Sequence, residues 1–286
     1  MSADRAAPAE TAASPPIVYI GPPAHRWRTL GLRQMAAYHD LLYFLVLRLV
    51  KVRYKQTFFG AGWAVLQPLI AMVAFTLVFG RLARLPSDGL PYAVFTYAAL
   101  VPWTYFANAL TQASNSLVDN ERMLTKVYFP RALLPLATVL AGLLDLVIAI
   151  IVLFGLLAVY GLTVPRNVWA LPAFLALAAL SAFAIGLWLS ALNVRYRDVR
   201  HAVPFLVQFW LFVTPVAYPS SLVPERFRLW YGLNPMVGVV DGFRWAVLGR
   251  PAAPASAVVS TVVILVLLVG GLGYFRRTER TFADII

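Results

Sequence analysis

The sequence predicts an all-α integral membrane protein with six transmembrane helices, and three observations carry this prediction. The chain of 286 residues is 61% hydrophobic and only 13% charged, whereas soluble domains carry about 25% charged residues. Several apolar stretches approach the about 20 residues that a helix needs to cross about 30 Å of hydrocarbon. The basic residues lie between these stretches, where they act as orientation signals. A soluble fold has no core large enough to hide so many apolar side chains.

The chain is predicted to begin with a disordered cytoplasmic tail over residues 1–35, which lack the apolar centre of a signal peptide. A basic, amphipathic stretch follows over 38–57. Its apolar residues recur at helical spacing on one face, while Arg48, Lys51 and Lys55 gather on another. This pattern predicts a helix that lies in the cytoplasmic interface, held by apolar burial and anionic headgroups. A helix packed on a partner protein is the alternative.

Six apolar segments are the predicted spans, and with the interface helix they make a membrane domain over 36–275. The second and the fifth are the weakest, because both contain proline and polar residues. A short cytoplasmic tail over 276–286 ends the chain. The predicted spans run over 59–79, 92–110, 133–160, 168–192, 203–218 and 257–275.

The distribution of positive charge supports this topology. With both termini in the cytoplasm, 17 of the 24 basic residues fall on the inside and 7 on the outside, as the positive-inside rule requires. A net charge of +12 would suggest nucleic-acid binding in a soluble protein. Here the placement of the charge between apolar segments favours orientation in a membrane.

The segment over 219–254, between spans five and six, is too long for a turn and too broken by Pro and Gly for a span. It is predicted to form two short re-entrant or surface helices on the outer face. A large outer loop without function is the alternative. Asp241 and Arg244, at i and i+3, are placed to pair in this segment and to shape an outer gate.

Catalytic motifs are missing. No Gly-Lys dipeptide occurs, so the chain has no Walker A loop for ATP, and H-E-x-x-H and G-x-S-x-G are also absent. There is no Cys, and the three His residues are scattered, which leaves no metal-ligand spacing. The prediction is a transporter subunit or channel, not an enzyme, with no cofactor or metal bound by this chain.

Three stretches together carry a family resemblance. They are VRYKQTFFGAGWAVLQP over 52–68, NSLVDNERMLTKVYFPRALLP over 115–135 and RRTERTFADII over 276–286. Their combination resembles the permease subunit of bacterial polysaccharide ABC exporters, the type-2 ABC exporter family, over 38–286. One departure is TFFGAGW, where the family often has a single aliphatic residue before Gly and a Leu before Trp.

The resemblance implies a homodimer with a continuous channel between the subunits, in the bacterial inner membrane. A separate ATPase would bind ATP and Mg on the cytoplasmic side. The loop over 116–128 would be the coupling helix, with Asp119, Glu121, Arg122 and Lys126 in contact with the ATPase. The substrate would be a lipid-linked polysaccharide, first of all O-antigen, with capsule or teichoic acid as other possibilities.

Other functions remain open on the residues alone. A permease of the same fold for a small drug or lipid is the main alternative. A membrane glycosyltransferase would need clustered acidic metal ligands, and a proton-coupled transporter would need internal repeats and more intramembrane ionisable groups.

Aromatic residues in spans two and five are candidates for channel lining, because sugar rings present apolar faces and conduction needs weak, repeated binding. Packing and interfacial belts are the alternative. The candidates are Phe95, Tyr97, Trp103, Tyr105, Phe106, Phe205, Phe209 and Phe212.

Asp145 lies deep in the third predicted span. A charge at the bilayer centre costs about 2.5–3.5 kcal/mol on insertion scales. Asp145 is therefore expected to face protein or water, to pair with a cation, or to be protonated. A structural hydrogen bond and a proton-coupling role are the two interpretations.

Overall fold

The computed structural model describes residues 32–55, 62–127, 129–249, 254–279 and 282, and every regular element in this part of the chain is helical. This confirms the predicted all-α class. The elements are α1 (Leu32–Ala37), α2 (His39–Lys55), α3 (Gly62–Phe75), η1 (Thr76–Leu82), α4 (Tyr92–Asn115), η2 (Val118–Asn120), α5 (Glu121–Leu124), α6 (Leu133–Ala141), α7 (Leu143–Val159), η3 (Arg166–Ala170), α8 (Leu171–Arg195), α9 (Val199–Val213), η4 (Ser220–Leu222), α10 (Glu225–Tyr231), α11 (Pro235–Leu248) and α12 (Pro254–Thr278).

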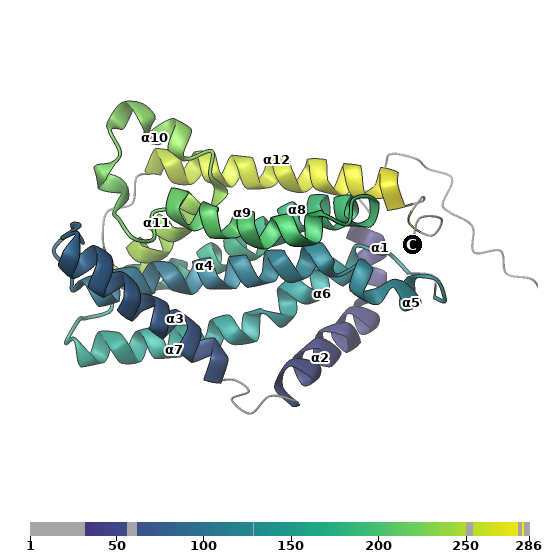
Figure 1. Cartoon of the computed structure of the whole chain (residues 1–286), viewed down its shortest axis with the longest axis horizontal. Helices are drawn as coiled ribbons and strands as arrows, with labels where there is room; N and C mark the ends of the chain where they lie inside the picture. Colours follow the sequence, from purple (N-terminus) through teal and green to yellow (C-terminus); the bar gives the residue numbers. More distant parts are fainter. Residues whose placement is uncertain (1–31, 56–61, 128, 250–253, 280–281, 283–286) are drawn as a thin grey trace, which may run out of the picture.

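The long helices form an elongated bundle with two distinct ends (Figure 1). One end carries α5, α1 and the C-terminal end of α12, and it is called the α5 end below. The opposite end carries α10 and the start of α12, and it is called the α10 end. Helix α2 crosses the bundle obliquely near the α5 end and packs on α6.

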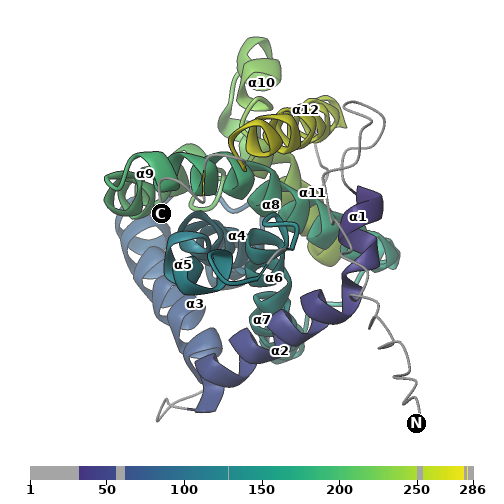
Figure 2. The same cartoon turned by 90° about the vertical axis from the view of Figure 1, so that its right-hand side faces the viewer.

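Helix α4 is the centre of the bundle (Figure 2). It contacts α3, α6, α7, α8, α9 and α11, and 17 of its 24 residues are buried. The close approach of α8 depends on Gly186, where a Cβ atom would lie 2.8 Å from the Cβ atom of Ala113. Small residues at such crossings let helices pack closely in membrane proteins.

Within the described residues, four helical segments are long and apolar enough to cross a membrane. They are Gly62–Leu82, Leu133–Val159, Arg166–Arg195 and Ala255–Thr278, and they coincide with predicted spans one, three, four and six. The two that fall short are α4 and α9, which are the two predicted spans with proline and polar residues. A membrane protein is therefore confirmed, whereas the number of six spans stays a prediction.

Two spans deviate from a regular α-helix. The first continues from α3 into the π-helix η1. The third is divided at Gly142 into α6 and α7, where a Cβ atom would lie 3.2 Å from the ring of Tyr105 on α4. Wide turns and breaks of this kind change the direction of a helix and often mark functional positions.

The segment between predicted spans five and six contains two helices, as expected from the sequence. The short α10 stands out at the surface of the bundle (Figure 1) and contacts α12. Helix α11 is buried among α4, α8 and α12. The side chain of Asn234 caps its start by accepting a 3.0 Å bond from the Met236 N–H group, and Gly249, with a φ of 67°, ends it.

Candidate functional site

The loop predicted as the coupling helix forms a compact, charged projection at the α5 end. The chain leaves α4, turns through η2 and forms the one-turn helix α5. Leu117 and Leu124 are buried and anchor the loop to the bundle. The four predicted contact residues, Asp119, Glu121, Arg122 and Lys126, are all exposed.

Two neighbouring elements border this loop. Asp119 lies 3.8 Å from Arg200 at the start of α9, and both side chains are more than half exposed, so the pair contributes little to stability. A shallow depression beside the loop is lined by Val118–Met123 and by Arg48 of α2. The interface helix and the loop thus share one surface, and a partner docking there would touch both.

The helix α2 occupies most of the range of the predicted interface helix, and its place in the membrane interface stays a prediction. Arg48, Lys51 and Lys55 are exposed along it, as are Tyr43 and Phe44. This combination of exposed cations and aromatic rings suits a membrane interface. The contact of α2 with α6 fixes one side of the helix to the bundle.

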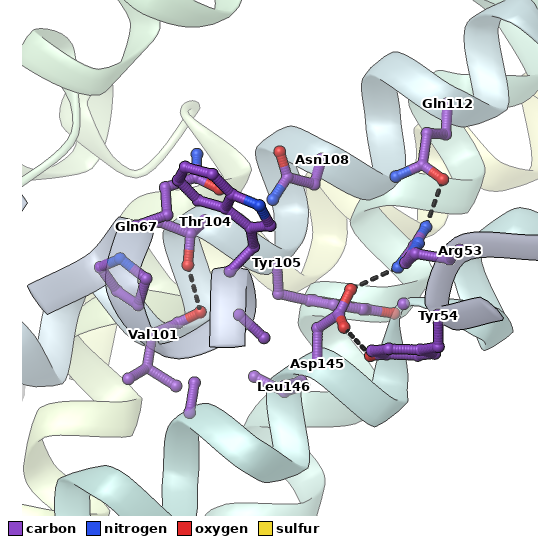
Figure 3. A pocket seen from close by; sticks show the side chains of 15 residues that line it. Arg53, Tyr54, Gln67, Val101, Thr104, Tyr105, Asn108, Gln112, Asp145 and Leu146 are labelled. Atoms are coloured by element: carbon purple, nitrogen blue, oxygen red, sulfur yellow. Dashed lines mark hydrogen bonds and ion pairs between the residues drawn. The ribbon is translucent and has the colours of Figure 1, made fainter. Parts of the chain in front are cut away.

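Asp145 has partners that the sequence did not reveal (Figure 3). Arg53, near the end of α2, forms a salt bridge with it and also donates to the side-chain oxygen of Gln112 on α4. The hydroxyl of Tyr54 donates to the second carboxylate oxygen of Asp145. Burial and this hydrogen bond raise the pKa of Tyr54 to about 12. The cation supplied by α2 offsets the cost of placing a carboxylate in the bundle.

This cluster closes one side of a partly open cavity of about 280 Å³, whose lining is part polar and part apolar. The cavity lies between the end of α2, the start of α3, the middle of α4 and the start of α7 (Figure 3). Its polar lining comprises Arg53, Tyr54, Gln67, Thr104, Tyr105, Asn108, Gln112 and Asp145, and Trp63 adds an aromatic ring.

The aromatic candidates divide into two groups. Phe205, Phe209 and Phe212 on α9 are exposed by 59%, 58% and 54%, and the rings of Phe205 and Phe209 lie 4.6 Å apart. They form an aromatic surface that the other described residues leave uncovered.

The aromatic residues of α4 have a different environment. Phe95, Tyr97, Trp103, Tyr105 and Phe106 are each at most 4% exposed, because α4 is surrounded by other helices. The hydroxyl of Tyr105 donates to the Val139 carbonyl at 3.0 Å. Within the single chain these five residues pack in the bundle, and Tyr105 also borders the cavity beside Asp145, so a channel-lining role for them stays a prediction.

No direct salt bridge joins Asp241 to Arg244 among the described side chains, because each makes hydrogen bonds to other partners. The two charges still act on each other, and their role in an outer gate stays a prediction. Ser220 donates to Asp241 at 2.5 Å. Arg244 donates to the carbonyls of Pro215 at 2.6 Å, Val216 at 2.8 Å and Phe95 at 3.2 Å. Arg244 also lies over the Phe95 ring, 3.6 Å from its centroid, so it ties α11 to α4 and to the segment after α9.

The described residues contain no group of three or more His, Asp or Glu side chains arranged to hold a metal ion. What the geometry offers instead is a charged, exposed loop at one end, a partly polar cavity inside the bundle and an exposed aromatic row on α9. These features define a helical membrane protein built for transport. The chain belongs to the ABC-2 type transporter family, which it matches over residues 40–248.

Two kinds of curated relative are similar to the chain. The O-antigen export system permease protein RfbA of Myxococcus xanthus is 30% identical over 89% of this chain and 98% of its own length. A protein of the same name from Klebsiella pneumoniae is 28% identical over 86% of this chain and 95% of its own. The polysialic acid transport protein KpsM of Escherichia coli is 22% identical over 82% and 92%.

Sequence reasoning missed the partners of Asp145 and the cavity beside it. One signal was present: Arg53 does not belong to the exposed basic group of Arg48, Lys51 and Lys55 on α2. A cation on a different face of an amphipathic helix indicates a contact inside the protein.

Proposed function

We propose that this chain is the membrane permease of an ABC exporter that moves a lipid-linked polysaccharide out of the bacterial cytoplasm, with O-antigen as the first candidate. The observation that carries the proposal is the 30% identity to an O-antigen export permease over 98% of that relative's length. A similarity over nearly the full length of the relative supports a shared transport function better than a shared fold does, since a fold alone does not define function.

The chain crosses the inner membrane six times, with both termini and the α5 end in the cytoplasm. Four spans are supported by length and hydropathy. Helix α4 acts as a fifth although it is less apolar, because protein rather than lipid surrounds most of it. Helix α9 has 15 residues, or about 22 Å at about 1.5 Å per residue, and the segment after it completes the sixth crossing. The excess of basic residues at the α5 end supports this orientation.

A separate ATPase subunit, which binds ATP and Mg, powers the transport by docking at the α5 end. Asp119, Glu121, Arg122 and Lys126 offer both signs of charge on a small, anchored projection. A push on this loop is passed to α4 and α6, which are continuous with it, as a rigid-body movement.

Two copies of the chain form the transport path between them. Helices α3 and α9 flank α4 and expose large apolar residues, among them Ile70 and Val73 on α3 and Phe205 and Phe209 on α9. A second copy across this face would bury part of that surface and enclose a channel lined by the aromatic row of α9.

Reconstitution tests the proposal. The chain is purified with the ATPase encoded beside it and placed in vesicles that contain a lipid-linked glycan, and glycan transfer is followed with and without ATP. We expect transfer only with both proteins and ATP. Transfer by the lone chain, driven by a proton gradient, would contradict the proposal.

A further inference from the structure

Helix α4 carries a polar stripe on the one face that the other described helices leave uncovered. Beyond its first residue, only six side chains of α4 are not buried. They recur at helical spacing and so lie on one face. The six are Thr104, Ala107, Asn108, Thr111, Gln112 and Asn115.

Five of these six side chains carry a hydroxyl or an amide, and none is charged. A face turned to lipid would be apolar, because polar groups without partners are costly in hydrocarbon. Four of the five polar side chains have hydrogen-bond partners in the chain, so this cost applies to Asn108, which is therefore expected to face water or a polar ligand.

Asn108 differs from the other four polar side chains of the stripe, each of which makes at least one hydrogen bond within the chain. The Thr104 and Thr111 hydroxyls donate to carbonyls one turn back, at 2.7 and 2.8 Å. Gln112 accepts from Arg53, and Asn115 accepts from Asn193 at 3.0 Å. Asn108 is exposed, and no hydrogen bond joins its amide to any other described residue. A primary amide offers two donors and an acceptor, so Asn108 is equipped for a ligand.

The stripe runs into the partly polar cavity. Figure 3 shows Thr104, Asn108 and Gln112 following one another along α4 at the cavity, with Gln67 of α3 nearby. Trp63, on the turn before Gln67, is 54% exposed and lines the same space. The volume of about 280 Å³ lies just below the range of about 300–1,000 Å³ that is usual for ligand pockets. The space suits a small ring.

The cavity is electrically balanced. Arg53 and Asp145 are the charged residues in its lining, and they form a salt bridge with each other. The remaining groups recognise hydrogen-bond donors and acceptors, without an excess of positive charge that would attract an anionic ligand.

We propose that the α4 stripe and this cavity form a subsite for uncharged saccharide units, in which Asn108 and Gln67 hydrogen-bond sugar hydroxyls and Trp63 packs on a sugar ring. The inference rests on the proposed function and narrows its substrate to neutral glycans. A polymer with a negative charge on each unit finds no free cation in this lining.

Cysteine labelling tests the subsite directly, because the chain contains no Cys. Asn108→Cys is prepared in the permease–ATPase complex, and its reaction with a water-soluble thiol reagent is timed with a mannose oligomer or a sialic acid oligomer of equal length. We expect the mannose oligomer to slow labelling at least about fivefold. A fivefold decrease in the unoccupied, reactive fraction corresponds to about 1 kcal/mol of stabilisation by the bound oligomer. The sialic acid oligomer should have no effect. Asn167→Cys at the α10 end is the matched control, and neither oligomer should protect it.

Equal protection of Asn108→Cys by both oligomers, or protection by neither, would overturn the inference.

A transport assay distinguishes a failure of this inference from a failure of the proposed function. Asn108→Leu is expected to reduce export of a lipid-linked mannose polymer about fivefold, the effect of one lost hydrogen bond of about 1 kcal/mol, while Asn167→Leu leaves it unchanged. If Asn108→Leu does not fold, export is measured in Gln67→Leu instead. Wild-type export in both Asn108→Leu and Gln67→Leu would refute the subsite and leave the proposed function intact. Failure of the wild-type complex to export any lipid-linked glycan would refute both.

Discussion

Arg53 near the end of α2 forms a salt bridge with Asp145 near the start of α7, 92 residues further along the chain. The two side chains are 26% and 27% exposed, so bulk water screens the pair only partly. This contact fixes the basic helix α2 to the bundle and turns an intramembrane carboxylate into a structural group.

Removal of the cation in Arg53→Ala is expected to destabilise the protein. Breaking a buried pair costs about 3–5 kcal/mol because it leaves a charge without a partner, and partial exposure places the effect near the lower limit. Thermal unfolding in lipid nanodiscs measures the change. Arg48→Ala on the exposed face of α2 should be neutral, and adding Asp145→Asn to Arg53→Ala should restore part of the stability. A melting temperature equal to wild type in Arg53→Ala would show that the pair is not structural.

Charge reversal on the coupling loop is expected to separate ATP hydrolysis from transport. In the double variant Glu121→Arg with Arg122→Glu, two exposed charges of the loop are exchanged, so ATPase docking should be altered while the bundle stays folded. Export should fall strongly, and ATP hydrolysis by the complex should no longer respond to substrate.

The chain offers a matched control for this experiment. Glu225 and Arg226 on α10 form the same exposed dipeptide at the opposite end of the bundle. The exchange Glu225→Arg with Arg226→Glu should leave coupling unchanged. Unaltered export after the exchange at Glu121 and Arg122 would remove the loop from the coupling machinery.

Gly238→Val is expected to destabilise the packing of α11 on α12. A Cβ atom at Gly238 would lie 2.7 Å from the Cβ atom of Ser260 and 2.9 Å from the Cα atom of Ala257, so the helices would have to move apart. Overpacking of this kind costs about 1–3 kcal/mol. Gly155→Val in α7 is the control, because no atom lies within 4 Å of that position. Equal loss of stability in both variants, measured by thermal unfolding, would contradict a specific close contact.

Glu279 is expected to make the attachment of the C-terminal segment sensitive to pH. Its carboxylate accepts a 2.9 Å bond from the Arg131 N–H group, and burial raises its pKa despite the positive charges of Arg131 and Arg276. The folded state therefore favours the protonated acid. This contribution to stability is present below the ordinary pKa of Glu and is lost as pH rises through the raised pKa. Glu279→Gln should melt at a similar temperature to wild type at low pH and at a higher temperature at pH 8. A wild-type pH profile in the variant would disprove the role of Glu279.

The sequence by itself determined the features that depend on apolar length and on the placement of charge, because both are properties of contiguous segments. Helices that occupy the predicted spans follow from runs of apolar residues, since a helix satisfies its backbone hydrogen bonds locally. The basic interface helix and the exposed charged loop follow from periodicity and composition in the same way.

Only the tertiary structure decided which residues meet. Phe95 on α4 and Phe209 on α9 belong to similar aromatic rows, yet one is buried and the other exposed, because α4 is surrounded by helices and α9 lies at the edge. Asp241 and Arg244 have the spacing of an ion pair, but neighbouring segments supply nearer partners. Arg53 reaches Asp145 through the crossing of α2 over the bundle. Such contacts depend on how helices distant in sequence pack together, and local periodicity does not encode that choice.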